Sequence, residues 1–159
     1  MLDLNYEWMK LAIKEAKIGE NNFEVPVGAV LVNLSNNELI SKSSNKIISS
    51  NNPLLHAEIE VIRKGVEFFN NRYLNNTAIY TTLEPCFMCA SAISEARISR
   101  LYFGTYDKKK GAINNDVRLF DNKIYHKPQI HGGLLEDECS KILKDFLQIL
   151  YSNIVLSFF

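Results

Sequence analysis

The spacing of apolar residues predicts a long helix near each end of the chain. Near the N-terminus, apolar residues recur at helical intervals, and we predict an amphipathic helix over residues 4–18, ended by Gly19. Its apolar positions are Trp8, Leu11, Ala12 and Ala16. Toward the C-terminus, an apolar stripe at i, i+3, i+4, i+7, i+8 and i+11 predicts a second amphipathic helix. This stripe consists of Cys139, Ile142, Leu143, Phe146, Leu147 and Leu150.

Short apolar runs between polar turns predict strands in the intervening chain. The predicted strands cover residues 27–32, 38–43, 78–82, 98–103 (ended by Gly104) and 129–131. The first of these is apolar throughout, as is typical of a strand buried on both faces. Two more helices are expected to begin near His56 and Cys86 and to end near residues 69 and 96. A hairpin followed by alternating helices and strands predicts an α/β sheet with helices on both faces, a topology that places ligand sites at strand ends.

Residues 107–128 break this pattern. The stretch contains Lys108, Lys109 and Lys110 followed by Gly111, with no periodic apolar face. Loops of this length inside a domain are usually functional or mobile. We therefore predict a long loop that carries a cluster of positive charge.

Composition limits the class of protein. The 159 residues suit one domain, residues 1–159, large enough to bury a core. Eighteen basic and eighteen acidic residues give no net charge, which argues against general nucleic-acid binding but allows a local basic patch. Three cysteines, an odd and sparse number, suit a reducing cytosol better than a disulfide framework. With no signal peptide and no apolar run long enough to span a bilayer, we expect a cytoplasmic protein with no membrane partner.

Two short motifs carry the candidate chemistry. His56-Ala57-Glu58 and Pro85-Cys86-Phe87-Met88-Cys89 supply one imidazole and two thiols, which are ligands that zinc prefers. Structural zinc sites usually have four protein ligands, whereas catalytic sites have three and leave a position for water. A carboxylate beside such a water can move its proton. The motifs therefore predict His56, Cys86 and Cys89 as zinc ligands and Glu58 as a catalytic proton carrier.

The spacing of these residues is consistent with two helix N-termini that face one ion. Pro53 stands before His56 and Pro85 before Cys86, where proline is a helix-start signal. Cys86 and Cys89 are three residues apart and therefore share one helix face, where the helix dipole favours thiolate. His56 and Glu58 are only two apart, so both can reach the ion only at the very start of a helix.

Each motif alone permits a simpler interpretation. A single histidine before an apolar helix is more often a packed or capping residue, and a lone C-x-x-C is also typical of a redox pair or half of a structural zinc site. A structural zinc module would need a fourth ligand, for which Cys139, His126 and His131 are available. Cys139 lies on the apolar stripe of the last helix, where a small buried residue is the commoner explanation. The two motifs together favour the catalytic interpretation.

The combination H-x-E followed by P-C-x-x-C is the signature of zinc-dependent base deaminases. Further segments, spread over residues 5–150, resemble the bacterial tRNA-specific adenosine deaminases. They are Glu24-Val25-Pro26-Val27-Gly28-Ala29-Val30, Thr82-Leu83-Glu84-Pro85-Cys86-Phe87-Met88-Cys89-Ala90, Arg97-Ile98, Phe103-Gly104, Asp107 and Gly111-Ala112.

This resemblance implies a fold and a reaction. The fold would be the three-layer α/β/α arrangement of cytidine deaminases, with a five-stranded mixed sheet. The protein would be a homodimer with one zinc ion per subunit. It would act on a tRNA anticodon stem-loop and convert the wobble adenosine to inosine, through a zinc-activated water that attacks C6, with Glu58 as the proton shuttle.

The resemblance also implies three substrate contacts. Asn45 would hold the target nucleoside, Val27 would line the base pocket, and Asp107 would contact the nucleic acid beside the target. Each residue also has a purely structural interpretation, as a turn residue, a core residue and a helix cap respectively.

Two departures from the family pattern leave the substrate open. The family usually has Asp-Pro-Thr-Ala before its His-Ala-Glu, whereas this chain has Leu54 and Leu55 in the last two positions, which would narrow or reshape the pocket. The family's last helix often carries arginines after paired aromatics, but here Leu147 and Gln148 follow Phe146. Lysines and an arginine of the long loop could replace that charge, since phosphate contacts supply much of the affinity for RNA; they are Lys108, Lys109, Lys110, Arg118, Lys123 and Lys127. The alternative is a deaminase of a free base or nucleoside of the guanine or cytosine type.

Overall fold

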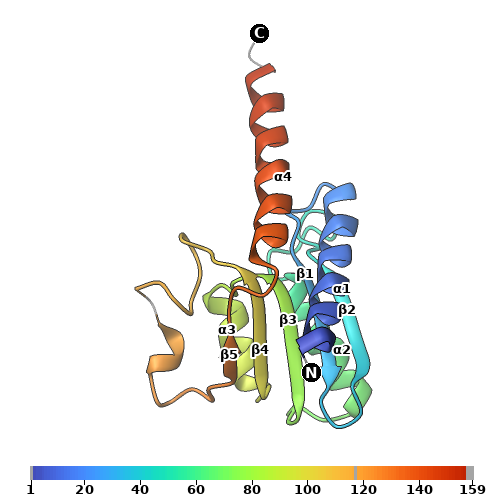
Figure 1. Cartoon of the computed structure of the whole chain (residues 1–159), viewed down its shortest axis with the longest axis vertical. Coiled ribbons are helices and arrows are strands. Elements are labelled where there is room, and N and C mark those ends of the chain that lie inside the picture. Colours follow the sequence, from blue (N-terminus) through green and yellow to red (C-terminus); the bar gives the residue numbers. More distant parts are fainter. Residues whose placement is uncertain (1, 117, 157–159) are drawn as a thin grey trace.

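Five strands form one mixed sheet at the centre of the structure, a computed structural model that describes residues 2–116 and 118–156 (Figure 1). The strands are β1 (Gly28–Asn33), β2 (Glu38–Ser44), β3 (Thr77–Leu83), β4 (Arg100–Thr105) and β5 (Gln129–His131). Their order across the sheet is β2-β1-β3-β4-β5. β1 runs antiparallel to β2 and β3, whereas β4 runs parallel to β3 and β5. The predicted five-stranded mixed sheet is confirmed.

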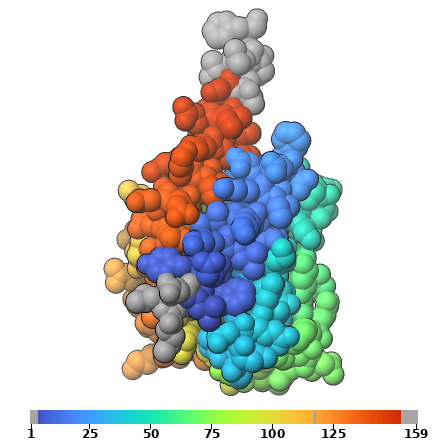
Figure 2. All heavy atoms as spheres, turned by 45° about the vertical axis from the view of Figure 1, so that its right-hand side comes forward, coloured from blue at the N-terminus to red at the C-terminus, as the bar shows by residue number. Residues whose placement is uncertain are grey.

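Helices cover both faces of this sheet. The helices are α1 (Leu2–Asn21), α2 (Ala57–Phe69), α3 (Phe87–Glu95) and α4 (Glu136–Leu156). Leu31 and Ile79 pack in one apolar core with α2 and α3, while Val30 and Tyr80 pack in a second core with α1 and α4. Successive side chains of a strand point to opposite faces, so a sheet covered on both sides needs apolar residues in succession. The three-layer α/β/α fold predicted for the chain is therefore confirmed, and Figure 2 shows α1 (blue) beside α4 (orange) in one outer layer.

Two glycines that were expected to end elements instead allow close packing. α1 continues past Gly19 to Asn21, and Gly19 packs closely against β2, since a Cβ there would lie only 3.0 Å from Cβ of Ser44. Gly104 lies inside β4, where a Cβ would come within 2.3 Å of the Cys139 sulfur. The predicted termini at these glycines were wrong, since the absent side chains make room for neighbours.

The apolar stripe of the last helix is buried only in its first half. Cys139 and Phe146 are 3% and 7% exposed, whereas Leu147 and Leu150 are 40% and 41% exposed. The reason is visible in Figure 1, where α4 continues past the end of the sheet. A helical stripe predicts which residues share a face but not how far the neighbouring layer extends.

The long loop has the irregular structure expected of it. Among its described residues only a short 3₁₀ helix, η1 (Leu119–Asp121), is regular. No helix in the described part of the chain is long and apolar enough to cross a membrane.

One edge of the sheet collects the ends of four strands. Because β3 and β4 are parallel neighbours, both carboxyl ends lie at this edge, and they lead to Cys86 and Asp107. β1 is antiparallel to β3, so its amino end, preceded by Val27, lies there too. β2 is antiparallel to β1 and brings Asn45, which follows it, to the same edge. Strand direction alone thus gathers residues that are far apart in the sequence.

Candidate active site

The three predicted zinc ligands meet at the starts of two helices. His56 and Cys86 occupy equivalent positions, as the extended N-cap residues of α2 and α3, and Cys89 lies in the first turn of α3. The Nδ1 atom of His56 lies 3.5 Å from Cys89 Sγ and 3.9 Å from Cys86 Sγ. All three ligand atoms lie within 4.8 Å of one another. The sequence prediction that two helix N-termini face one site agrees with this geometry.

This donor set fits a zinc ion. Zinc bound tetrahedrally, at about 2.3 Å from sulfur and about 2.0 Å from nitrogen, separates a nitrogen from a sulfur ligand by roughly 3.5 Å. The two measured nitrogen–sulfur distances are close to that value. One imidazole and two thiols leave one tetrahedral position for a non-protein ligand.

The protein environment favours a thiolate at Cys86. A hydrogen bond from the Cys89 thiol, with a further contribution from His56, lowers the pKa of Cys86 to about 4. The same interaction with Cys86, together with burial, raises the pKa of Cys89. Hydrogen bonding to Cys86 also raises the pKa of His56. Before any metal binds, the site therefore holds one thiolate, stabilised by two neighbouring donors.

Glu58 lies in the first turn of α2, beside these ligands, with one oxygen unsatisfied. It is only 3% exposed, and its Oε2 has no hydrogen-bond partner among the described residues. Burial raises the pKa of its carboxyl. A buried, unpaired carboxylate oxygen is unfavourable and is rare outside functional sites. This orphan oxygen is the feature expected if the site binds a further polar group.

No fourth protein ligand is available in the described structure. Cys139 packs in the core on the opposite face of the sheet, and burial raises its pKa to about 12. His126 Nε2 lies 3.1 Å from the carbonyl oxygen of Ile98, and the ring of His131 stacks on Tyr102. Of the described histidine, cysteine and acidic residues, only the three predicted ligands form a metal-binding group. The alternative of a closed structural site is therefore wrong, because none of these three residues joins the metal-binding group. Cys139 in particular is separated from it by the sheet.

Asn45 and Val27 lie together beside the start of α2. The Asn45 side-chain oxygen accepts a hydrogen bond from the Ala57 N–H at 2.9 Å, and its amide nitrogen donates to the Val25 carbonyl at 3.1 Å. Its backbone N–H donates to the Val27 carbonyl. Asn45 is 4% and Val27 5% exposed, the latter in the core under α2. Asn45 thus satisfies an N–H that the helix itself cannot, and it holds the residue after His56.

Asp107 lies in the loop after β4, apart from Asn45 and Val27, and its side chain holds the backbone of the lysines that follow it. Its Oδ1 accepts hydrogen bonds from the N–H groups of Lys109 and Lys110 at 2.9 and 3.0 Å. The adjoining lysines, with Cys86 and Phe87, line an open cavity of about 710 Å³. Leu54 does not line this cavity and is 57% exposed. The cavity beside Cys86 is therefore bounded by the loop after β4 and not by Leu54.

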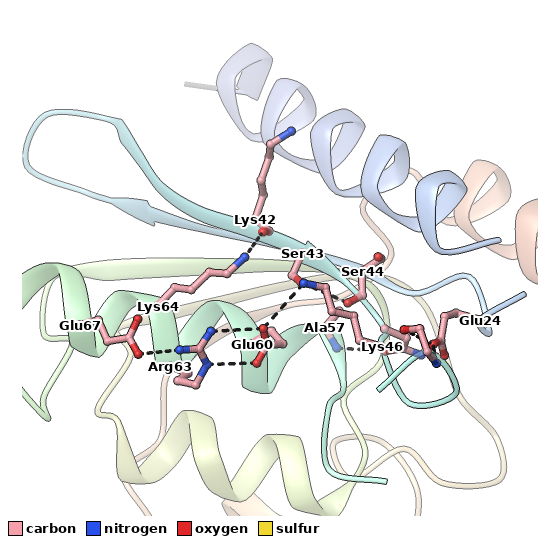
Figure 3. Close-up of polar contacts among 12 residues, drawn as sticks. Glu24, Lys42, Ser43, Ser44, Lys46, Ala57, Glu60, Arg63, Lys64 and Glu67 are labelled. Carbon is pink, nitrogen blue, oxygen red and sulfur yellow. Dashed lines mark hydrogen bonds and ion pairs between the residues drawn. The ribbon is translucent and has the colours of Figure 1, made fainter. Parts of the chain in front are cut away.

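Sequence reasoning missed two buried glutamates that hold the loops around the site. Glu24 is 1% exposed and accepts hydrogen bonds from the N–H groups of Ile48 and Ser49 and from the Ser49 hydroxyl (Figure 3). Burial alone would raise the pKa of Glu24, but these donors outweigh it and hold the pKa below its ordinary value. Glu84 has the same arrangement on the other side of the site, with amide donors from the long loop. A glutamate one or two residues before a proline was the only available signal, since the donors are 23 to 30 residues away.

The geometry agrees with comparisons to known proteins. Residues 3–105 match the family model of the cytidine and deoxycytidylate deaminase zinc-binding region. The class defined by fold and site is thus a zinc-binding deaminase domain.

Individual relatives narrow this class. The chain is 41% identical over 147 residues to the tRNA-specific adenosine deaminase of Rickettsia typhi, covering 92% of this chain and 99% of that protein. It is 45% identical over 149 residues to the corresponding protein of Buchnera aphidicola, covering 93% and 91%. A solved structure from a study of A-to-I editing by tRNA:A34 deaminases at the wobble position superposes with a TM-score of 0.83 at 43% identity, covering 86% of this chain and 99% of that one. The chain belongs to the family of tRNA-specific adenosine deaminases.

Proposed function

We propose that this protein hydrolyses adenosine to inosine at the wobble position of a tRNA anticodon. The observation that carries the proposal is a three-ligand metal site with the unpaired Glu58 oxygen buried beside it. Relatives named for this activity match nearly the whole chain, which supports the choice of substrate.

In this mechanism His56, Cys86 and Cys89 hold one zinc ion. When bound there, zinc supplies Lewis acidity, which lowers the pKa of water to near neutrality. Glu58 takes a proton from the attacking water and delivers it to the ring nitrogen next to C6, then assists protonation of the departing amine. The C6–O bond forms and the C6–N bond breaks, so adenosine and water yield inosine and ammonia. Burial suits Glu58 to this task, because a carboxyl that readily holds a proton can also return it.

The substrate contacts are proposals of the same kind. Asn45 uses one acceptor site and one donor hydrogen within the protein, which leaves a lone pair and a hydrogen for a nucleoside. Val27 contributes apolar surface at the same edge of the sheet. Asp107 contacts the nucleic acid beside the target, through the loop that bounds the cavity.

We further propose that residues 1–159 act as one catalytic domain within a cytoplasmic homodimer. The resemblance to the tRNA deaminases supports the dimer, and a tRNA substrate supports the location. The exposed apolar side chains of Leu54 and Phe87, near the two ligand-bearing helix starts, are candidates for burial in the dimer. Sedimentation velocity tests the dimer directly.

Replacing Glu58 with alanine separates chemistry from metal binding. We expect Glu58→Ala to retain one zinc per subunit and to lose about 10²–10⁴-fold in kcat, the contribution that general acid–base catalysis typically makes. Zinc content is measured by atomic absorption and turnover by ammonia release. Glu67→Ala, on the exposed face of the same helix, is the matched control. Loss of zinc in Glu58→Ala would contradict the assigned role.

The substrate is tested by ammonia release from an anticodon stem-loop with a wobble adenosine, beside free adenosine, guanine and cytosine. We expect turnover of the stem-loop and at most trace turnover of the free compounds. The neutral net charge and the C-terminal helix without arginines are the features that favour the alternative of a free base. Efficient turnover of guanine or cytosine, with none of the stem-loop, would establish that alternative instead.

A further inference from the structure

Glu84 is a buried carboxylate whose hydrogen-bond partners all belong to the backbone of the long loop. It is 2% exposed. Its Oε2 accepts from the Asp107 N–H at 3.1 Å, and its Oε1 accepts from the N–H groups of Ile113 and Asn114 at 3.0 and 2.8 Å. Within the described chain no lysine, arginine or histidine forms an ion pair with it. The partial positive charges of three backbone N–H groups therefore stabilise the Glu84 carboxylate in place of a charged side chain.

Strand direction explains why Glu84 and this loop meet. β3 and β4 are parallel neighbours with Leu83 opposite Thr105, so residue 84 and the start of the loop leave the sheet side by side. The Glu84 N–H donates to the Thr105 carbonyl at 2.8 Å. The loop then folds back, since the Ala112 N–H donates to the Pro85 carbonyl and Gly111 bridges to Cys86. The loop is thus attached to the segment that carries a metal ligand.

Gly111 makes the contact with Glu84 possible. A Cβ at Gly111 would lie 2.5 Å from Glu84 Cδ and 2.6 Å from its Oε2. Both distances are far inside van der Waals contact, so any side chain here would displace the carboxylate. The loop and the glutamate therefore fit each other closely.

The part of the loop held in this way borders the cavity beside Cys86. Residues 107–114, named here the lysine loop, carry the exposed Lys108, Lys109 and Lys110. These three lysines and Gly111 line the cavity that also contains Cys86. The position of Glu84 thus determines where the lysines stand relative to the metal site.

We propose that Glu84 is a positioning residue that holds the lysine loop in its substrate-binding conformation. A loop ordered before binding loses less entropy when the ligand arrives, so preorganisation raises affinity. Glu84 acts through the lysine loop and touches neither metal nor substrate. The choice of RNA as the ligand rests on the proposed function, whereas the ordering of the loop does not.

Glu84→Gln tests this role because it preserves shape and removes one acceptor. A carboxylate only accepts hydrogen bonds, whereas a carboxamide must turn its NH₂ toward either Asp107 or the Ile113–Asn114 pair. We expect faster hydrogen exchange at the amides of these three residues in the zinc-loaded protein without RNA. We also expect KM for the stem-loop to rise about tenfold, equivalent to one lost charge-assisted hydrogen bond, with kcat changed less than about threefold and zinc content unchanged.

Gly111→Ala approaches the same contact from the loop side and is the second variant. It should raise KM and amide exchange in the same direction, and the two effects should be less than additive in the double variant, since both changes disturb the contact with Glu84. Ile98→Val, in the core just before β4, is the control for general destabilisation and should leave KM unchanged.

Three results would overturn the proposal. Unchanged exchange at the three amides in a folded Glu84→Gln would show that the loop does not depend on the carboxylate. Loss of zinc, or a lower kcat at constant KM, in Glu84→Gln would show that Glu84 stabilises the metal site and does not position the lysine loop. If Ile98→Val raised KM as much as Glu84→Gln does, the effect of Glu84→Gln on KM would come from a general loss of protein stability. If the wild type fails to act on the stem-loop, the proposed function fails, while amide exchange still decides the role of Glu84.

Discussion

At the scale of single residues, the three cysteines differ because of what surrounds each sulfur. Cys86 is half-buried and receives hydrogen bonds that favour its thiolate, whereas Cys89 beside it is fully buried. Cys139 lies in an apolar core, where burial raises the pKa of its thiol. Thiolate, not thiol, is the reactive and metal-binding form. The three side chains are chemically identical, so differences in their reactivity come from the surroundings that the fold gives each of them.

We predict that alkylation of the zinc-free protein starts at Cys86. Because the pKa of Cys86 is lowered to about 4, its reaction with iodoacetamide should be nearly independent of pH between 6 and 8. Peptide mapping after chelation measures the site and rate, and circular dichroism checks that the fold persists. The zinc-loaded protein, in which both ligand thiols are occupied, should be protected. Labelling of Cys139 first, or a rate that rises with pH near 8.5, would contradict this prediction.

At the scale of elements, both helices of the candidate metal site begin at an N-cap residue that is itself a predicted ligand. His56 and Cys86 have extended backbones at equivalent positions, so their side chains lie at the helix ends. Such positions depend on the preceding loop, because residues before the N-cap are not restrained by helical hydrogen bonds. The loop before α2 is held by Asn45 and by Glu24, which is labelled in Figure 3, and the segment before α3 contains Glu84.

We predict that Glu24→Gln destabilises the protein only while the native carboxyl is ionised. At pH 7 the loss should be roughly 1–3 kcal/mol, the usual value for hydrogen bonds to a charged group. The folded-state pKa of Glu24 lies below the ordinary value of 4.5. The advantage of the wild type is therefore complete above about pH 4.5 and disappears as the pH falls through the folded-state pKa.

Urea unfolding of both proteins between pH 7 and pH 3 measures this convergence. The difference between the two free energies of unfolding cancels losses that they share, such as release of zinc at low pH. A difference that stays constant over the whole range would show that Glu24 acts through packing and not through its charge.

At the scale of the whole molecule, a chain without net charge concentrates positive charge on one loop. Lys108, Lys109 and Lys110 are exposed, and in the described structure none of them pairs with a carboxylate. They border the cavity beside Cys86. Local concentration of charge, and not the overall balance, determines where a phosphate backbone would bind.

We predict that replacing these three lysines with glutamine weakens stem-loop binding and reduces its salt dependence. Each phosphate contact to single-stranded RNA contributes about −0.7 to the slope of log affinity against log salt. The triple variant should therefore have a slope shallower by up to about 2 and an unchanged zinc content, while kcat at saturating RNA falls less than affinity.

The matched control replaces three exposed lysines in the other helical layer, Lys14 and Lys17 of α1 and Lys144 of α4. It makes the same change in net charge away from the cavity and should leave the slope unchanged. Equal slopes in the wild type and the Lys108–110 variant would show that the loop is only a solvated surface.

Local patterns were sufficient to predict the elements and the three side chains that meet in the candidate metal site. Helical and strand periodicity is a property of short segments, so the five strands and four helices were found with errors only at their ends. The meeting of His56, Cys86 and Cys89 was predictable because few residue types bind zinc and helix N-termini require particular spacings. The position of Glu58 beside them was predictable for the same reason, since only the start of a helix lets it share a site with His56, whereas its role in catalysis stays a prediction.

The tertiary structure alone decided which distant groups meet. Glu24 and Glu84 are buried on backbone N–H groups 23 to 30 residues away, and every residue except proline has such a group, so the sequence does not show which ones are used. Gly104 and Cys139 were each given local roles, as a strand end and a stripe residue, although the fold uses them together. The order and direction of the strands bring these groups to one edge or one face of the sheet, and that arrangement depends on the whole chain.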